Sequence, residues 1–117
     1  MITMIYASNH GGKMNQVVLV GKIKIVGELK EVKGYPLSHI VLSLKKDYMK
    51  EESEIDTDDF KVLLWKQLAK ENAEVLKKDM LVSIKGRLQP HNYQKDADSP
   101  LFYGCEIVAE KINRIND

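Results

Sequence analysis

The sequence predicts an all-β domain with a single short helix, and three observations support this fold class. From Met14 onward, most of the chain alternates apolar and polar residues with a period of two, which is typical of half-buried strands. One segment, residues 66–78, changes to a period near 3.6, which is typical of an amphipathic helix. Two apolar runs contain a central glycine, Gly21 or Gly86, where we expect a bulge or a sharp bend in the strand.

Three strands precede the predicted helix. The first is expected at residues 17–29, and a turn at residues 33–36 separates it from the second, at residues 39–46. The acidic run EESEIDTDD, residues 51–59, is too polar to pack and is interpreted as a solvated hairpin connection. The third strand follows at residues 60–65.

The helix and two further strands complete the predicted domain. The helix ends in a pair of lysines, Lys77 and Lys78, where cations are favoured. The last strands are predicted at residues 80–88 and 101–115, joined by a polar loop. Five strands with one helix between the third and fourth is the element order of an OB-fold, a five-stranded, partly open Greek-key barrel. Another small β-barrel, or an α+β sandwich of the same elements, is the alternative.

Length and composition exclude several classes of protein. The chain has 117 residues, which corresponds to one domain, and no stretch contains the roughly 18 consecutive apolar residues of a membrane-spanning helix. The single cysteine, Cys105, excludes an internal disulfide and is interpreted as a small buried hydrophobe. Residues 1–13 have little periodicity, so we expect an N-terminal extension followed by one domain at 14–117. The extension lacks the features of a targeting signal, which predicts a cytoplasmic protein.

Positive charge is concentrated in two blocks. Residues 1–50 carry eight lysines and three acidic residues, and residues 60–95 carry seven lysines, one arginine and three acidic residues. The acidic run and an acidic C-terminal segment mask both blocks, so that the formal net charge is only +1. A basic face would favour polyanions by counterion release, whereas the alternative is that the lysines are simply solvated on strand and helix surfaces.

Three segments resemble the bacterial single-stranded DNA-binding protein family: residues 15–23 (NQVVLVGKI), 62–93 and 106–115 (EIVAEKINRI). The match of each segment alone is modest, but the order and spacing of the three segments together are specific. The resemblance covers about residues 14–115. It implies a homo-oligomer, a tetramer rather than a dimer, that binds single-stranded DNA without sequence preference in replication, repair or recombination. It also implies no enzymatic activity, no cofactor and no metal, and a nucleoid-associated location.

Single-strand binding needs exposed aromatic rings on which bases stack and a basic track for the backbone. The resemblance assigns the stacking role to Trp65, the only tryptophan, and to Tyr93 in the last hairpin, and it places Tyr48 at the base of an earlier hairpin. Phe60 lies five residues before Trp65, an odd offset that points it to the opposite strand face. We therefore interpret Phe60 as a core or subunit-interface residue, although the family usually carries a stacking aromatic six residues before the Trp65 position.

Four lysines are candidates for the backbone track. Lys61 lies four residues before Trp65 on the same strand face, which places a cation beside the ring. Lys66 follows Trp65, Lys22 follows the first glycine of the opening strand, and Lys78 closes the predicted helix. Each of these three could equally be an ordinary solvated lysine.

Enzymatic and metal-binding functions find no support in the residues. The three histidines, His10, His39 and His91, lack metal-ligand spacing, and no nucleophile has a partner base in view. A second hypothesis is a divergent OB-fold paralogue that acts as a primosomal or replication-restart interaction module and binds DNA weakly. The sequence stops at Asp117 without the acidic, apolar tip of longer family members, so we expect no tail-mediated replication and repair partners.

Overall fold

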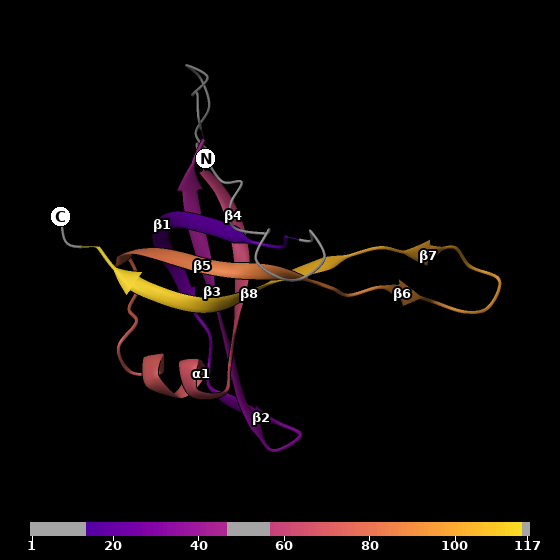
Figure 1. Ribbon diagram of the computed structural model, residues 1–117, viewed down its shortest axis with the longest axis horizontal. Coiled ribbons are helices and arrows are strands. Elements are labelled where there is room, and N and C mark those ends of the chain that lie inside the picture. The colour runs from indigo at the N-terminus through magenta and orange to yellow at the C-terminus, as the bar shows by residue number, and fades with distance from the viewer. Residues whose placement is uncertain (1–13, 47–56, 116–117) are drawn as a thin grey trace.

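Five long strands form a closed barrel in the computed structural model, which describes residues 14–46 and 57–115. They are β1 (Val17–Val26), β3 (Tyr35–Lys45), β4 (Thr57–Trp65), β5 (Leu81–Pro90) and β8 (Cys105–Arg114). Their order is β1-β5-β8-β4-β3, and β1 also pairs with β3, which closes the sheet (Figure 1). The β4–β8 pair is parallel and the other four barrel pairs are antiparallel.

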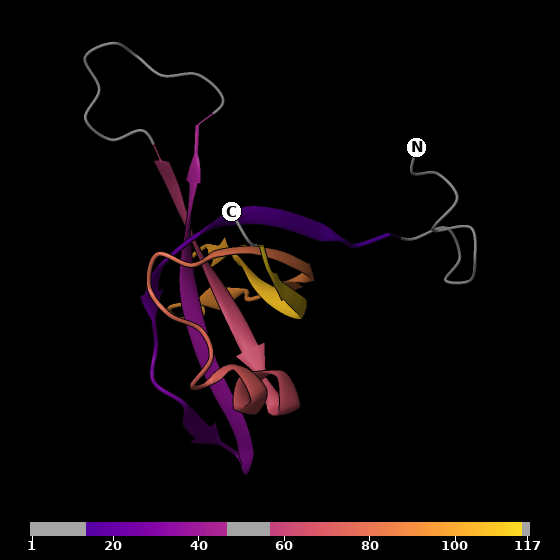
Figure 2. The ribbon, with the colours of Figure 1, turned by 90° about the vertical axis from the view of Figure 1, so that its left-hand side faces the viewer.

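The shorter elements lie at the two ends of the longer strands. Helix α1 (Lys66–Asn72) follows β4 directly, and β2 (Lys30–Val32) pairs with the start of β3. Figures 1 and 2 show α1 and the β2–β3 hairpin at the same end of the barrel. A second hairpin, β6 (Tyr93–Gln94) and β7 (Leu101–Phe102), extends away from the barrel between β5 and β8 (Figure 1). This arrangement confirms the predicted OB-fold with one short helix between the third and fourth barrel strands.

The core is formed by alternate residues of the barrel strands together with one face of the helical segment. The fully buried side chains are aliphatic, and burying each contributes about 1.5–3 kcal/mol relative to leaving it exposed. The buried cluster comprises Ile23, Ile40, Leu42, Val62, Leu64, Ala69, Leu76, Val82, Ile84 and Ala109. In the described part of the chain, no helix is long and apolar enough to cross a membrane.

The helix is shorter than the periodicity predicts. It ends at Asn72, whose side-chain amide donates a hydrogen bond of 2.9 Å to the Leu68 carbonyl oxygen. The backbone N–H groups of Val75 and Leu76 both donate to the Asn72 carbonyl oxygen, so the chain turns sharply after the helix. Leu76 stays buried in this turn. Lys78 therefore lies in the turn before β5 and does not close the helix, which corrects that prediction.

The strand boundaries also differ from the prediction. The second barrel strand begins at Tyr35 rather than residue 39, because Pro36 and its neighbours pair with the short strand β2. The third barrel strand begins at Thr57, inside the acidic run. The predicted last strand divides at Gly104, so that Leu101–Phe102 belong to the projecting hairpin and β8 starts at Cys105. Residues 1–13 and 47–56, including most of the acidic run, lie outside the described residues.

The two strand glycines have different structural roles. At Gly86 the β5–β8 register shifts, as predicted for a bulge, and an added Cβ would lie 2.2 Å from the Val108 carbonyl oxygen. Gly21 instead pairs regularly with Val82, so it is not a bulge, and the other alternative, a sharp bend, stays a prediction. A Cβ at Gly21 would lie 2.6 Å from the Ser43 carbonyl oxygen, which indicates that close strand approach requires the glycine.

Candidate nucleic-acid interface

The outer faces of β3 and β4 form one continuous surface. In β4, Val62 and Leu64 are buried in the core, so Lys61, Leu63 and Trp65 lie on the outer face of the barrel. The β3 residues directly opposite these three are, in order, Val41, His39 and Leu37. Trp65 and Lys61 therefore share a face, as the alternation predicts. This face combines one large aromatic side chain with a cation.

Trp65 occupies the junction between β4 and α1. Its backbone is extended and its side chain is half-buried, and the next residue, Lys66, begins the helix with a left-handed φ of 55°. This conformation is unfavourable for a residue with a side chain, because Cβ comes close to the following carbonyl oxygen. The Lys66 side chain lies over the ring of Tyr35, with 4.8 Å between Nζ and the ring centre. The junction thus places a second aromatic ring and a cation beside Trp65.

Tyr35 is a candidate contact that the sequence analysis missed. It lies two residues from Leu37, the partner of Trp65, so Tyr35 is on the same outer face and diagonal to Trp65. Tyr35 is 51% exposed, which leaves ring surface available to a ligand. Lys30 and Lys70 line the cleft around it. The sequence predicts a turn at residue 35, although its alternation with Leu37 also fits a strand residue.

Strand β1 adds two more lysines to the same face. Lys22 is exposed and lies opposite Ser43 of β3. The β1–β3 register shifts between Ile23 and Ile25, so Lys24 is an extra residue in β1 at this point. Its Nζ lies 2.7 Å from the Asp59 carboxylate on β4. Lys22 and Lys61 thus flank the Lys24–Asp59 ion pair on the outer face. Together with Lys66, they are the lysines of the predicted backbone track that lie on this face.

The hairpin between β5 and β8 carries a separate group of aromatic residues. Tyr93 stacks on Phe102 across the hairpin, with 5.8 Å between ring centres and 27° between ring planes. Both rings are more than half exposed, and the side chain of Tyr103 is 80% exposed. Tyr93 is a predicted contact, whereas the prediction of one strand at residues 101–115 assigns no such role to Phe102 and Tyr103. The signal that could have separated them is Gly104, which interrupts the run.

His39 lies half-buried in the middle of the outer face. Its ring packs so closely on Gly27 that a Cβ at that glycine would lie 2.4 Å from the ring. Burial lowers the pKa of His39 below its usual value, and the positive charges of Lys61 and Lys30 lower it further. The ring is therefore neutral at pH 7, with one nitrogen able to donate and the other able to accept a hydrogen bond.

The structure does not bring every predicted residue to this face. Lys78 lies in a different cleft, beside Arg114, and Tyr48 lies outside the described residues. Phe60 is on the same side of β4 as Val62, opposite to Trp65, because the β3–β4 register is unbroken. Cys105 is exposed at the start of β8, so its predicted burial is wrong.

Within the described residues, no group of three or more His, Cys, Asp or Glu side chains is placed to hold a metal ion. The polar side chains of the outer face include single lysines, the Lys24–Asp59 ion pair and the neutral His39. These groups suit hydrogen bonding and charge neutralisation of a polyanion.

Comparison with curated proteins identifies several relatives of similar sequence. The chain is 29% identical over 100 residues to single-stranded DNA-binding protein 2 of Listeria innocua and 32% identical to single-stranded DNA-binding protein 3 of the same organism, in each case covering 85% of this chain and 62% of the relative. It is 27% identical over 99 residues to single-stranded DNA-binding protein B of Bacillus subtilis, covering 87% of that protein. The chain thus spans about three fifths of the length of the two Listeria relatives.

The structural and family comparisons agree with this. The crystal structure of a single-stranded DNA-binding protein from Thermus aquaticus matches the fold with a TM-score of 0.68 and 21% identity, covering 88% of this chain and 50% of that one. The model of the Single-strand binding protein family matches residues 14–115, which is nearly all of the patterned sequence. The chain belongs to the Single-strand binding protein family.

Proposed function

We propose that this protein binds single-stranded DNA without sequence preference, in DNA replication, repair or recombination. The observation that carries the proposal is the outer face of β3 and β4, where Trp65 and Lys61 lie in one row with Leu63 between them. On this face, bases stack on Trp65 and phosphates contact lysines. The protein acts as a binding protein of the cytoplasmic nucleoid, with no catalytic step and no cofactor.

The geometry explains why sequence preference is not expected. Every base has a π face, so stacking on an aromatic side chain contributes about 1–3 kcal/mol whatever the base. Lysine contacts to phosphate carry no sequence information. Tyr35, beside Trp65, and Tyr93, on the projecting hairpin, supply two further rings for a strand that passes along the barrel.

We also propose that the protein acts as a homo-oligomer, with a tetramer favoured over a dimer. Strand β1 carries Val18 and Val20 on the outside of the barrel, 63% and 51% exposed, opposite Lys85 and Ser83 of β5. An exposed row of valines on a regular strand is suited to packing against a second copy. The alternative, a replication-restart interaction module with weak DNA binding, is not favoured, because the relatives are named single-stranded DNA-binding proteins.

A fluorescence titration tests the proposed DNA binding. Trp65 is the only tryptophan, so its emission reports one position on the outer face. Adding oligothymidine at low salt should quench the emission, and the affinity should fall as salt rises, because bound phosphates release counterions. Trp65→Phe, followed with a labelled oligonucleotide, serves as the matched variant and should retain most of the affinity. If the folded wild-type protein shows neither quenching nor binding of the labelled oligonucleotide, the proposal is wrong.

A further inference from the structure

A polar cluster of three residues crosses three barrel strands on the face that carries Trp65. The Asp59 carboxylate of β4 accepts a hydrogen bond of 2.7 Å from Lys24 Nζ of β1 and another of 2.7 Å from Ser43 Oγ of β3. Each carboxylate oxygen has one of these partners, Oδ2 for Lys24 and Oδ1 for Ser43. Asp59 thus lies at the centre of a cluster that joins β1, β3 and β4.

The backbone places all three side chains on the outer face. Asp59 is six residues before Trp65 in a strand of unbroken register, so the two side chains point the same way. Ser43 lies directly opposite Asp59. Lys24 is the extra residue at the β1 irregularity, and such bulges redirect a side chain away from the regular alternation. The irregularity therefore turns Lys24 toward β4.

The Asp59 carboxylate has a large effect on the charge of this face. Hydrogen bonds from Lys24 and then from Ser43 hold the pKa of Asp59 below its usual value, so the group is ionised at all physiological pH values. The ionised carboxylate neutralises Lys24 and opposes any phosphate that approaches between Lys22 and Lys61. Without the Asp59 carboxylate, Lys22 and Lys24 of β1 and Lys61 of β4 would form one basic row.

The Lys24–Asp59 ion pair is partly exposed and contributes little to the stability of the barrel. The Lys24 and Asp59 side chains are 53% and 36% exposed. Ion pairs this exposed contribute little to protein stability, so Asp59 and Lys24 can each be replaced without unfolding the barrel. The cluster is therefore not needed to hold the barrel together, which the buried aliphatic core does.

We propose that Asp59 is an electrostatic brake on nucleic-acid binding, which holds Lys24 away from the phosphate backbone and lowers the affinity of the face. This inference rests on the proposed single-stranded DNA binding and deepens it. Its consequence is that Lys24 makes no net contribution to binding in the wild-type protein and contributes one phosphate contact once Asp59 is neutralised.

The test compares Asp59→Asn with Asp58→Asn in oligothymidine binding across a salt series. Both variants remove one negative charge, from adjacent positions of β4. The Asp58 side chain, however, contacts Lys46 at 3.9 Å and points to the opposite face of the strand from Asp59. Asp59→Asn should steepen the slope of log affinity against log salt by about 0.7, the value for one added phosphate on a single strand, and tighten binding about five-fold at 0.1 M salt. Asp58→Asn should leave the slope unchanged.

A double-mutant cycle with Lys24→Gln identifies the cation that is released. Lys24→Gln alone should leave the salt slope at the wild-type value, because no phosphate contact is lost, whereas in the Asp59→Asn background it should remove the whole increase in slope. Ser43→Ala provides a further control, because it removes one hydrogen bond but leaves the Asp59 charge, so the slope should stay at the wild-type value. Urea unfolding of each variant confirms that the compared proteins are folded.

The outcomes separate this inference from the proposed function. If wild-type protein binds with a clear salt dependence but both aspartate variants behave alike, the brake is wrong and DNA binding stands. An equal decrease in salt slope on Lys24→Gln with and without Asp59 would overturn it as well, since Lys24 would then already contact phosphate in the wild-type protein. If neither the wild-type protein nor Asp59→Asn binds, both proposals fail together.

Discussion

Lys66 adopts a left-handed φ of 55° directly after Trp65, and its side chain covers the ring of Tyr35. Such a backbone costs a residue with Cβ about 1–2 kcal/mol, and glycine avoids this cost. Lys66→Gly should therefore have a free energy of unfolding about 1 kcal/mol higher than Lys66→Ala in urea titrations. Both variants lose the cation and should bind oligothymidine more weakly than the wild-type protein.

Lys33 provides the matched control for this prediction. It has a similar φ of 51°, at the turn of the β2–β3 hairpin. Lys33→Gly should exceed Lys33→Ala in stability by a similar amount, while both retain more of the wild-type DNA affinity than the Lys66 pair. Equal stability of the glycine and alanine variants at position 66 would contradict the argument.

His39 predicts a pH dependence of stability. Its pKa is lowered from 6.5 in the folded protein, first by burial and then by Lys61 and Lys30, so the unfolded chain binds the proton more readily. The free energy of unfolding should therefore be highest above pH 6.5, and fall as the pH decreases from there through the folded-state pKa. Urea titrations over this range measure the fall.

Replacing His39 tests whether this residue causes the pH dependence of stability. His39→Gln should flatten the dependence near neutral pH, and His91→Gln, at an exposed position between β5 and β6, is the matched substitution. Asp59 acts in a separate window, because its lowered pKa affects stability only as the pH falls below its usual 3.8. A pH profile that is unchanged in His39→Gln would show that another group is responsible.

For single residues on the outer face of β3 and β4, the sequence predicts the orientation of the side chain only where local alternation determines it. Trp65 and Lys61 share a face, and Phe60 lies on the other, because β4 keeps its register from end to end. Tyr35 and Asp59 were missed as parts of the site because their roles depend on partners far away in the sequence. The contact of Asp59 with Lys24 spans 35 positions and depends on a bulge that no local pattern reveals.

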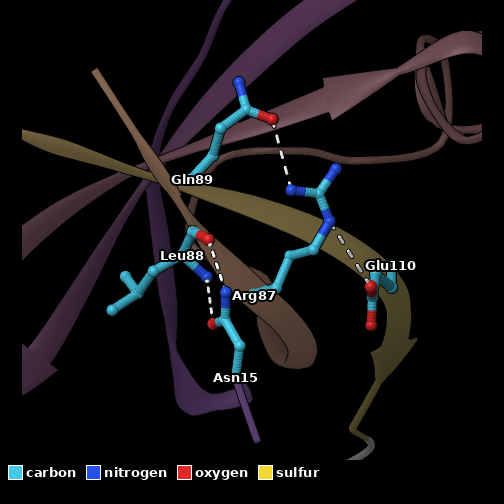
Figure 3. A network of polar contacts seen from close by, with 5 residues as sticks. All are labelled: Asn15, Arg87, Leu88, Gln89 and Glu110. Carbon is cyan, nitrogen blue, oxygen red and sulfur yellow. Dashed lines mark hydrogen bonds and ion pairs between the residues drawn. The ribbon is translucent and has the colours of Figure 1, made fainter. Parts of the chain in front are cut away.

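At the scale of elements, Asn15 extends the pairing of β1 and β5 beyond the first residue of β1. Its side-chain amide donates to the Leu88 carbonyl oxygen and accepts from the Leu88 backbone N–H, both at 2.8 Å (Figure 3). Asn15→Ala removes both hydrogen bonds and should lower the free energy of unfolding by about 1–2 kcal/mol. Urea titration measures the loss, and Gln16→Ala, at the neighbouring exposed position, should have little effect.

An aspartate at this position refines the prediction. Asn15→Asp can still accept from the Leu88 N–H but can no longer donate to the Leu88 carbonyl oxygen. Its stability should therefore fall between those of the wild-type protein and Asn15→Ala. If Asn15→Ala is as stable as Gln16→Ala, the two hydrogen bonds contribute nothing and the β1 start is held by other contacts.

Helical periodicity predicted which side chains of residues 66–78 are buried better than it predicted the helix itself. Leu76 and Ala69 are both in the core, yet the helix ends at Asn72 and Leu76 lies in the following turn. Apolar spacing reports which residues face the core, whereas the backbone hydrogen bonds also depend on local competitors such as the Asn72 amide. The strands were predicted more reliably, because barrel closure preserves their alternation.

At the scale of the whole molecule, the outside of the barrel divides into two surfaces of different chemistry. The first half of β1 presents Val18 and Val20 beside β5, whereas its second half presents Lys22 and Lys24 beside β3. One strand thus contributes to an apolar surface suited to self-association and to a basic surface suited to DNA. An oligomer built through the valines would leave the faces that carry Trp65 open to solvent.

Val18→Glu tests this division. A carboxylate on the exposed valine row should oppose packing of a second copy, because burying an unpaired charge costs far more than the valine contact contributes. Light scattering after size exclusion should show a smaller particle than the wild-type oligomer.

Val32→Glu, which makes the same change at an exposed valine on β2, should keep the wild-type mass. Since β1 and β4 are not neighbours in the barrel, the fluorescence of the dissociated variant should still be quenched by oligothymidine. Its apparent affinity should be lower, because fewer binding faces are linked. If Val18→Glu retains the wild-type mass, the valine row is not the interface, and the subunits associate through another surface.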